Sequence, residues 1–399
     1  MPVDPFAKAG LHQAEDILKA HGVDAYHRSA AERTGDSHVI IDGRKILMAG
    51  SNDYLGLSTH PRVIEAAVTA LRRFGTTVSG SRVLNGTLDL HGELEARLAA
   101  HLGQEAAAVT TTGFGANLAL AALLGRDDIA FGDARNHVSL VEGVRLGLGK
   151  ARTFRHRDLA DLRSKLAAAP SGGGRLIITD SVFSMDGDVA DLPALRSIAD
   201  EYEAKLIVDA AHDMGVLDLT AGIRADLVTG SLSKSFASAG GVLAGPAGYV
   251  RYLRSNARSI LFSIAMPPAS AAAALAALDV IAAEPERRAR CLELAAGLHD
   301  GLRALGFDTR PSTTPIVPVR FPDLAAAGAF WAALFAAGVY TNLAGPPAAA
   351  HAMLRLTLTA NHDDTHLDTV LTAFDEAARR LGTARDPALP AATLTVPHG

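Results

Sequence analysis

The chain has 399 residues, of which 48% are hydrophobic and 20% charged, and its formal net charge is −5 at pH 7. This length is sufficient for two domains with sizeable cores. The slightly acidic balance excludes the basic surface expected of a nucleic-acid-binding protein. A single cysteine, Cys291, excludes an internal disulfide and is typical of a reducing compartment. Because the chain also lacks a signal-peptide pattern and a long apolar run, we expect a cytoplasmic protein without a transmembrane segment.

Residues 1–45 form an N-terminal segment in which two patterns stand out. The stretch LHQAEDILKAHG has the apolar spacing of an amphipathic helix. It is followed by SHVIIDGRKILMAG, which alternates apolar and polar residues around a glycine turn. We therefore predict a helix followed by a β-hairpin.

Residues 46–284 alternate between helical and short apolar patterns. One predicted helix begins at Pro61, and another ends before Gly103, in agreement with the usual places of these residues at helix ends. The predicted strands are AAAVTTT, DIAFG, RLIITD, KLIVDA, DLVTGS and GGVLAG. This alternation predicts an α/β domain with a mainly parallel sheet covered by helices on both faces.

The pattern changes after residue 284. Longer helical stretches and isolated strands, TPIVPVRF and LRLTLTA, predict a smaller α+β domain over residues 285–385. The remaining segment, residues 386–399, is rich in proline and alanine, and we expect it to be a flexible tail.

Polar residues gather just after the predicted strands, where open parallel sheets bind their ligands. Gly113 and Phe114 follow the first strand at the start of a helix, where backbone N–H groups favour an anion. Asp209 ends another strand, and His212 follows three residues later. A buried carboxylate needs a cationic or hydrogen-bonding partner. Taken singly, each feature equally fits a structural turn or cap.

Three more polar residues follow other strands of the predicted sheet. His137 comes after DIAFG, Ser184 after RLIITD, and Lys234 after DLVTGS. No His or Cys spacing suggests a metal site. An anion cradle, a flat side chain, a carboxylate and a primary amine are the groups that pyridoxal 5′-phosphate (PLP) requires. The combination therefore predicts a PLP site with Lys234 as the Schiff-base lysine.

Two other interpretations stay open on these residues. Ser231 and Lys234 have the S-x-x-K spacing of serine acyl-enzymes, although the K-T-G and S-D-N motifs of that class are missing. A PLP aminotransferase or retro-aldol lyase with the same fold is the second alternative. A colourless protein would favour the acyl-enzyme, whereas release of both CO₂ and free thiol from an amino acid and acyl-CoA would favour a synthase.

Several longer motifs carry a resemblance to a known family. These are SNDYLGL, SGSRVLNGTLDLHGELE, TTTGFGAN, NHVSLVEG, DSVFSMDGD, VDAAHDMGV, GSLSKSFASAGG and LRLTLTANH. In this order they are similar to the α-oxoamine synthases, fold-type I PLP enzymes that include serine palmitoyltransferase, 2-amino-3-ketobutyrate CoA ligase and 8-amino-7-oxononanoate synthase. The resemblance covers residues 40–380. It implies a seven-stranded sheet, PLP as cofactor, decarboxylative condensation of an amino acid with an acyl thioester, and a homodimer with a shared active site.

The resemblance also assigns expected roles by motif position. Lys234 would bind the cofactor covalently, Asp209 its ring nitrogen, and His137 would stack on the ring. The other implied cofactor contacts are Thr112, Gly113, Phe114 and Ser231 at the phosphate, Ser184 and His212 near the ring oxygen, and Ser263 reaching the phosphate from the neighbouring subunit. The implied substrate-binding residues are Asn52, Ser81 and Arg355, of which Arg355 would receive the amino acid carboxylate.

Four positions depart from the pattern common in the family. Ser231 stands where threonine is frequent, Thr112 replaces a serine, Ile264 replaces a threonine, and Ala210 replaces an acidic residue. None of these changes removes a catalytic group, and the presence of the lysine, aspartate and histidines argues against an inactive regulatory subunit. The sequence leaves open which small amino acid is used, the acyl length, and whether the donor is acyl-CoA or an acyl-carrier protein.

Overall fold

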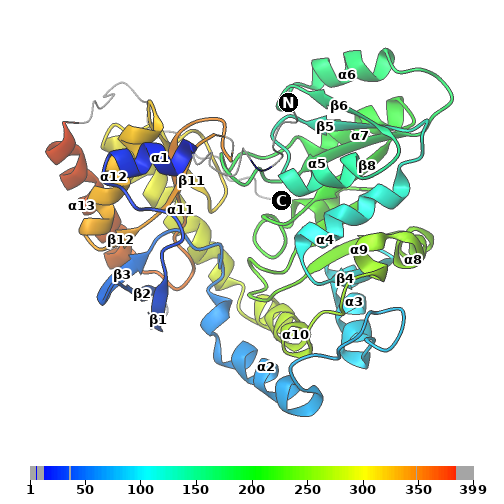
Figure 1. The fold of residues 1–399 in the computed structure, drawn as a ribbon, viewed down its shortest axis with the longest axis horizontal. Coiled ribbons are helices and arrows are strands. Elements are labelled where there is room, and N and C mark those ends of the chain that lie inside the picture. Colours follow the sequence, from blue (N-terminus) through cyan, green and yellow to red (C-terminus); the bar gives the residue numbers. More distant parts are fainter. Residues whose placement is uncertain (1–5, 7–12, 36, 347, 383–399) are drawn as a thin grey trace. The chain divides into compact units, whose positions relative to one another are not determined.

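The computed structural model describes residues 6, 13–35, 37–346 and 348–382, which form parts of two compact units (Figure 1). We call Asn52–Ser184 together with Asp188–Arg288 the sheet unit. The terminal unit comprises Met1–Ser51, Met185–Gly187 and Ala289–Gly399. Within the described residues, no helix is long and apolar enough to cross a membrane.

A seven-stranded sheet forms the centre of the sheet unit, in the order β4-β10-β9-β8-β7-β5-β6. Its strands are β4 (Ala106–Thr110), β5 (Ile129–Asp133), β6 (Lys150–Phe154), β7 (Arg175–Asp180), β8 (Lys205–Asp209), β9 (Leu227–Ser231) and β10 (Gly241–Gly245). Strand β10 pairs antiparallel with both neighbours, whereas β6, β5, β7, β8 and β9 pair in parallel. The predicted α/β class and mainly parallel sheet are confirmed, and β6 is a strand that the sequence patterns did not reveal.

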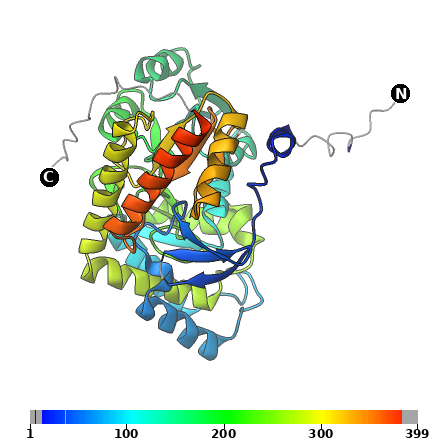
Figure 2. The same cartoon turned by 90° about the vertical axis from the view of Figure 1, so that its left-hand side faces the viewer.

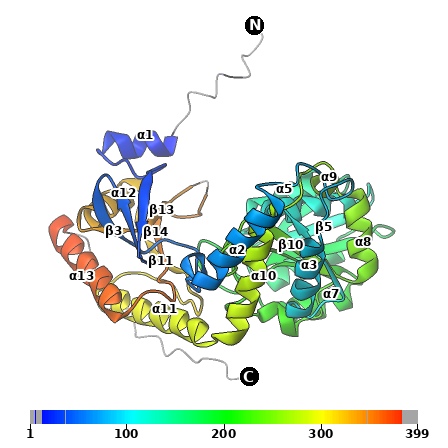
Figure 3. The ribbon, with the colours of Figure 1, turned by 90° about the horizontal axis from the view of Figure 1, so that it is seen from below.

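Helices surround this sheet. They are α2 (Pro61–Phe74), α3 (Asp89–His101), α4 (Gly113–Leu118), α5 (Val138–Arg145), α6 (Leu159–Ala167), α7 (Leu192–Glu201), α8 (Ala247–Asn256), α9 (Arg258–Leu261) and α10 (Pro268–Ala283), with short 3-10 helices at Leu57–Thr59, Ala119–Leu123 and Leu219–Gly222. Figure 3 shows α2 and α10 side by side, and the two helices contact each other. Pro61 occupies the first turn of α2 as predicted, because its missing N–H is not needed there.

The central strands are buried along their whole length, which explains their continuous apolar sequences. Every residue of β9 is buried, and in β8 only the first residue is exposed. Such strands are covered on both faces, as parallel sheets require. Charged side chains of the central strands lie at the strand ends, and β5, β7, β8 and β9 all end at the same edge because they run in parallel.

The terminal unit contains two small sheets and a helical layer. One sheet has the order β1 (Ala30–Thr34), β2 (His38–Ile41), β3 (Arg44–Met48) and β12 (Val339–Tyr340), and the other β11 (Val317–Arg320), β14 (Met353–Leu356) and β13 (Asn342–Ala344). The antiparallel pair β2–β3 confirms the predicted hairpin. Short α1 (Gln13–Ala20) lies within the predicted N-terminal helix. The expected flexible tail lies outside the described residues.

Three helices of the terminal unit run side by side in Figure 2: α11 (Glu286–Ala304), α12 (Leu324–Ala336) and α13 (Asp364–Leu381). Small residues allow the close approach, since a Cβ at Gly301 would lie 2.5 Å from a methyl group of Leu371. Phe330 and Phe374 stand at the centre of the aromatic core beneath these helices, with ring centroids 5.2 Å apart. This packing explains the longer helical patterns in the C-terminal third of the sequence.

Candidate cofactor and substrate site

Four of the parallel strands deliver polar residues to one edge of the sheet. Asp180 ends β7, Asp209 ends β8, His137 follows β5, and Lys234 follows β9. The charges of Asp209 and Lys234 both act on His137 and on Asp180, so the four side chains share one electrostatic environment. The sheet therefore brings together the lysine, aspartate and histidine that the sequence analysis selected.

The carboxylate of Asp209 is buried and accepts two hydrogen bonds. Its side chain has 4% of its surface exposed. Asn117 Nδ2 donates to Asp209 Oδ2 at 2.6 Å, and the backbone N–H of Ala211 donates to Oδ1 at 2.9 Å. Both donors are neutral, so the site retains an anion that suits a cationic partner such as a protonated ring nitrogen.

His137 is the N-cap residue of α5 and has polar partners on two sides. Its backbone N–H donates to Asp180 Oδ2 at 2.7 Å, and its Nδ1 lies 2.6 Å from Ser139 Oγ. Partial burial holds the pKa of His137 below its usual value; Asp209 opposes this shift, and the cation of Lys234 adds to it. A neutral, flat imidazole beside the lysine is suited to stacking on an aromatic ring.

A second carboxyl group, Asp180, lies in the same environment. It is almost fully buried. Burial, together with the negative charge of Asp209, raises the pKa of Asp180 well above its usual value. Asp180 also accepts a hydrogen bond from the backbone N–H of His137.

The residues predicted to hold the phosphate lie where β4 leads into α4. A Cβ at Gly113 would lie 2.7 Å from Ser231 Cβ, so glycine is required for this close approach. Thr112 is the N-cap of α4, and its Oγ1 accepts from Gly115 N at 3.0 Å. The hydroxyl of Ser231 lies 2.7 Å from Ser233 Oγ. Thr112, Gly113 and Ser231 thus meet at one place, next to the half-exposed ring of Phe114.

His212 has a partner that the sequence analysis missed. The hydroxyl of Tyr54 lies 2.5 Å from His212 Nδ1, and Tyr54 is fully buried. The turn that carries Tyr54 is held by Asp53, whose Oδ1 accepts from Leu57 N at 2.9 Å. The SNDYLGL motif therefore contributes to the site through Tyr54, whose hydroxyl orients the ring of His212.

The chain is similar to known proteins over most of its length. The profile of the family "Aminotransferase class I and II" matches residues 44–374. Serine palmitoyltransferase of Sphingobacterium spiritivorum is 41% identical over 88% of this chain and 91% of its own. An 8-amino-7-oxononanoate synthase of Geobacter sulfurreducens is 40% identical over 92% of this chain and 97% of its own. The solved structure of the K265A variant of a serine palmitoyltransferase from S. paucimobilis, with a bound PLP–myriocin aldimine, superposes with a TM-score of 0.92 at 31% identity, covering 95% of this chain and 100% of that one.

The chain belongs to the α-oxoamine synthase family. It is a PLP-dependent acyltransferase of fold type I. The residues of the sheet edge fit PLP: a glycine pressed against a serine at the cradle, a buried carboxylate at Asp209, and Lys234 within electrostatic reach of both His137 and Asp180. This membership removes the S-x-x-K acyl-enzyme interpretation.

The remaining predicted site residues of the synthase have known places but untested roles. Ser184 lies in the loop that follows β7, and Asn52 is the first residue of the sheet unit. The carbonyl of Ser81 closes a turn by accepting from Leu84 N and Gly86 N. Within the same chain, Ser263 Oγ lies 3.3 Å from Thr111 Oγ1, next to the cradle. Its expected contact with the neighbouring subunit stays a prediction.

Arg355 belongs to the terminal unit of the synthase. It lies on β14, opposite Pro318 of β11 and Asn342 of β13, and only 4% of its surface is exposed. A buried arginine at the centre of a small sheet is unusual without a function or a partner. Its predicted contact with the amino acid carboxylate stays a prediction.

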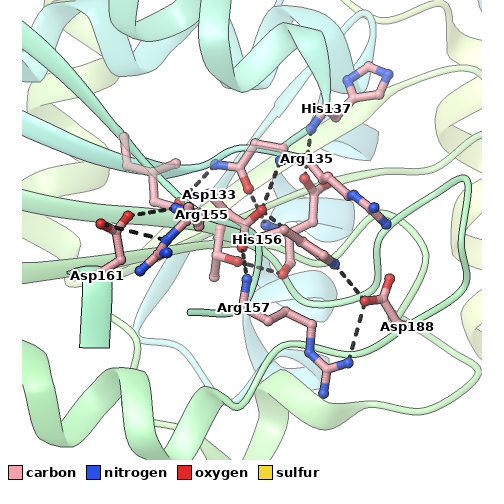
Figure 4. A network of polar contacts seen from close by, with 12 residues as sticks. Asp133, Arg135, His137, Arg155, His156, Arg157, Asp161 and Asp188 are labelled. Atoms are coloured by element: carbon pink, nitrogen blue, oxygen red, sulfur yellow. Dashed lines mark hydrogen bonds and ion pairs between the residues drawn. The ribbon is translucent and has the colours of Figure 1, made fainter. Parts of the chain in front are cut away.

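His156 and two carboxylates form a polar cluster that supports the segment carrying His137 (Figure 4). His156 follows β6 and lies 2.8 Å from Asp133 Oδ1 and 2.7 Å from Asp188 Oδ2. Burial opposes its protonation, but the hydrogen bonds and charges of the two carboxylates raise the pKa of His156 to about 9. Asp133 also accepts from the backbone N–H of Arg135, two residues before His137.

The synthase thus contains supporting residues that the sequence analysis did not select: Tyr54, Asn117, Ser139, Asp133, His156 and Asp188. Asn117 gave a signal that could have been used, because a single amide stands in the otherwise apolar helix GFGANLALAAL. Such a residue is costly to bury unless it has partners. The others lack any local sign, because their partners come from distant parts of the chain.

Proposed function

We propose that this synthase condenses serine, glycine or alanine with an acyl thioester, either acyl-CoA or an acyl-carrier protein. The products would be an α-amino ketone, CO₂ and the free thiol. The observation that carries the proposal is the buried Asp209 carboxylate in the same electrostatic environment as Lys234, at the edge where Gly113 meets Ser231. The names of the similar proteins, serine palmitoyltransferase and 8-amino-7-oxononanoate synthase, support the reaction class but differ in substrate.

Each site residue has a distinct task in this reaction. PLP, when bound, supplies an electron sink for the bonds at the amino acid Cα. Asp209, oriented by Asn117, would hold the ring nitrogen in its protonated form, because a carboxylate favours a cation next to it. The amine of Lys234 is the base that removes the Cα proton. His137 would stack on the ring and exclude water from that face.

Arg355 would complete the site as the group that binds the amino acid carboxylate. A guanidinium forms two parallel hydrogen bonds with a carboxylate and so fixes its orientation. By fixing the carboxylate, Arg355 would determine which Cα bond of the amino acid is presented for cleavage. The residue is buried and rigidly held in a sheet, which suits a positioning role.

A matrix of substrates tests the proposal. Purified holoenzyme is incubated with each small amino acid and with acyl-CoA or acyl-carrier thioesters of several chain lengths, and the products are followed by mass spectrometry. We expect an amino ketone, with one CO₂ and one thiol released per turnover, and none from the Lys234→Ala variant. Transfer of the amino group to a keto acid without thiol release would instead support an aminotransferase.

We also propose that the synthase works as a homodimer with its sites at the subunit interface. Large apolar side chains next to predicted site residues are exposed in the single chain: Val83, Leu84, Phe114, Val138, Phe262 and Ile264. Phe262 is 83% exposed and Leu84 82%. Exposed apolar groups of this size normally mark an interface. Their positions beside Gly113, His137 and Ser263 support an interface that includes the site.

The homodimer is tested by light scattering on the purified protein. We expect a dimer for the wild type and a shift toward monomer for Phe262→Asp, with loss of activity. The matched control is Leu381→Asp, which changes an exposed leucine of the terminal unit and should leave the dimer intact. A monomeric, fully active wild type would contradict the proposal.

The single buried cysteine supports a cytoplasmic location, which fractionation of the source cells would test.

A further inference from the structure

Four side chains form a continuous hydrogen-bond chain across the site. Asp209 Oδ2 lies 2.6 Å from Asn117 Nδ2, and the same nitrogen lies 2.8 Å from Ser139 Oγ. Ser139 Oγ in turn lies 2.6 Å from His137 Nδ1. Asn117 and Ser139 are almost fully buried, so water does not compete for these contacts. We call these residues the Asp209–His137 chain.

The carboxylate determines the orientation of the Asn117 amide in this chain. An ionised carboxylate only accepts, so the amide of Asn117 must turn its NH₂ group toward Asp209. The same NH₂ group donates its second hydrogen to Ser139 Oγ. The hydroxyl hydrogen of Ser139 is then available for donation to His137 Nδ1. Turning the amide over would place its oxygen against the carboxylate.

Another contact gives the same result independently of the amide. The backbone N–H of Ser139 points at His137 Nδ1 at a distance of 3.3 Å, as the N-cap of α5. A backbone N–H can only donate, so this longer contact also favours a lone pair on Nδ1, in addition to the hydroxyl of Ser139. A proton on Nδ1 would face both this N–H and the hydroxyl. The proton of the neutral ring therefore belongs on Nε2.

The geometry depends on the close packing of two helices. A Cβ at Gly143 of α5 would lie 2.2 Å from the backbone oxygen of Asn117 in α4. Only glycine permits this approach, which brings Ser139, at the start of α5, to the amide. The amide oxygen of Asn117 has no hydrogen-bond partner within the described residues. This unpaired oxygen is a cost of the orientation that the carboxylate imposes.

We infer that Asn117 and Ser139 are positioning residues that hold His137 as a neutral imidazole with its proton on Nε2, under the control of Asp209. The consequence for catalysis rests on the proposed function. A neutral ring can stack on a cofactor whose nitrogen is protonated, whereas an imidazolium would be repelled by it. The other charged groups that face His137 are Asp180, at its backbone, and Lys234.

The tautomer can be measured in the apoprotein, without any turnover. Protein labelled with ¹⁵N-histidine is studied by long-range ¹H–¹⁵N NMR, and the His137 signals are assigned with a His137→Gln variant. We expect a neutral ring protonated on Nε2 at pH 7.5. The Ser139→Ala variant should populate the Nδ1-protonated form and raise the pKa of His137 by about half to one pH unit, the size expected for loss of one hydrogen bond.

Asp209→Asn provides the decisive comparison, because it lies at the far end of the chain. The introduced amide lets Asn117 turn over, so the tautomer of His137 should change as it does in Ser139→Ala. Ser139→Thr keeps the hydroxyl and should keep the wild-type tautomer. The matched control is Ser181→Ala, which removes a buried hydroxyl bonded to the Asp209 backbone carbonyl and should leave His137 unchanged.

Two results would overturn the inference. One is a wild-type His137 that is protonated on Nδ1 or doubly protonated at pH 7.5, and this measurement needs no variant to fold. The other is an unchanged tautomer in both Ser139→Ala and Asp209→Asn. Neither result depends on amino ketone formation, so failure of this inference and failure of the proposed function can be told apart.

Discussion

His137 and His156 occupy equivalent places in the sheet but have opposite electrostatic properties. Each follows one of two neighbouring parallel strands, β5 and β6, and both lie at the same edge (Figure 4). The pKa of His137 lies below its usual value, whereas that of His156 is raised to about 9. Strand position alone therefore does not decide whether a histidine at this edge carries a charge.

The partners of each ring explain the difference. His156 lies between two carboxylates, Asp133 and Asp188, so a proton on both ring nitrogens is stabilised. Burial and the positive charge of Lys234 lower the pKa of His137, and its Nδ1 faces a hydroxyl and a backbone N–H in place of a carboxylate. We interpret His156 and its two carboxylates as a charged cluster that holds the surrounding loops, here called the charged clamp. We interpret His137 as a neutral surface for the cofactor.

The same comparison separates residues that stabilise the fold from residues that take part in the proposed reaction. Asp133 and Asp188 fix the segments leading to His137 and following Ser184, but they do not take part in the proposed reaction. Asp209 and Lys234 take part directly. Variants in the two regions should therefore affect different measurements, and the predictions below are ordered by the size of the expected effect.

The largest effect is expected for Asp209→Asn. Loss of the anion beside the ring nitrogen should lower kcat for amino ketone formation by about three orders of magnitude, as for other main electrostatic groups of active sites. The matched variant Asp188→Asn, in the His156 cluster, should change kcat less than about tenfold. Both are measured at saturating PLP. An Asp209→Asn enzyme that keeps more than a tenth of the wild-type kcat would contradict the assignment.

His156→Gln should mainly affect stability. It leaves two carboxylates, one of them buried, without their cation, and breaking such pairs typically costs about 3 kcal/mol of unfolding free energy. His137→Gln, at the equivalent place, should cost less than about 1 kcal/mol because its ring is neutral and open to the site. Urea unfolding of the apoproteins at pH 7 measures both. Equal losses would remove the distinction between the two histidines.

The contribution of His156 should depend on pH with a defined sign. Its folded pKa of about 9 lies above the ordinary value of 6.5, so the stabilisation is complete below pH 6.5 and is lost as the pH rises toward 9. After allowance for solvent screening we expect a loss of about 2 kcal/mol. The free energy of unfolding of wild type minus His156→Gln, measured from pH 6 to 10, isolates this term. A constant difference across that range would refute the charged clamp.

The smallest effect is expected for Arg157→Ala. Its guanidinium lies 3.5 Å from Asp188, but the side chain is about half exposed. Exposed ion pairs contribute little, so the unfolding free energy should change by less than about 0.5 kcal/mol. The comparison with His156→Gln, made under identical conditions, shows which cation stabilises Asp188. A loss as large as that of His156→Gln would assign the clamp to the arginine instead.

The sequence patterns predicted most of the sheet because its inner strands are short apolar runs bounded by polar residues. They missed β6, whose sequence KARTF is mostly polar. This strand lies at the edge of the sheet, where one side faces solvent and the apolar run is not required. The hairpin β2–β3 was predicted because its alternation and its glycine turn are both local.

The site was predicted unevenly for a similar reason. Lys234, Asp209 and His137 stand at the ends of apolar strands, and parallel strands bring such ends together whatever the detailed packing. Tyr54 and His156 could not be selected, since Tyr54 contacts a residue 158 positions away and His156 contacts Asp188 across 32. Only folding shows that these distant residues meet.

The sequence by itself determined the α/β class, the family and the residues at the strand ends, because periodicity and motif order are properties of the chain alone. The tertiary structure decided which of those residues are charged and which are oriented by neighbours. His137 and His156 are the same amino acid after adjacent strands, and their protonation differs because it depends on groups that other strands and loops place within hydrogen-bond distance.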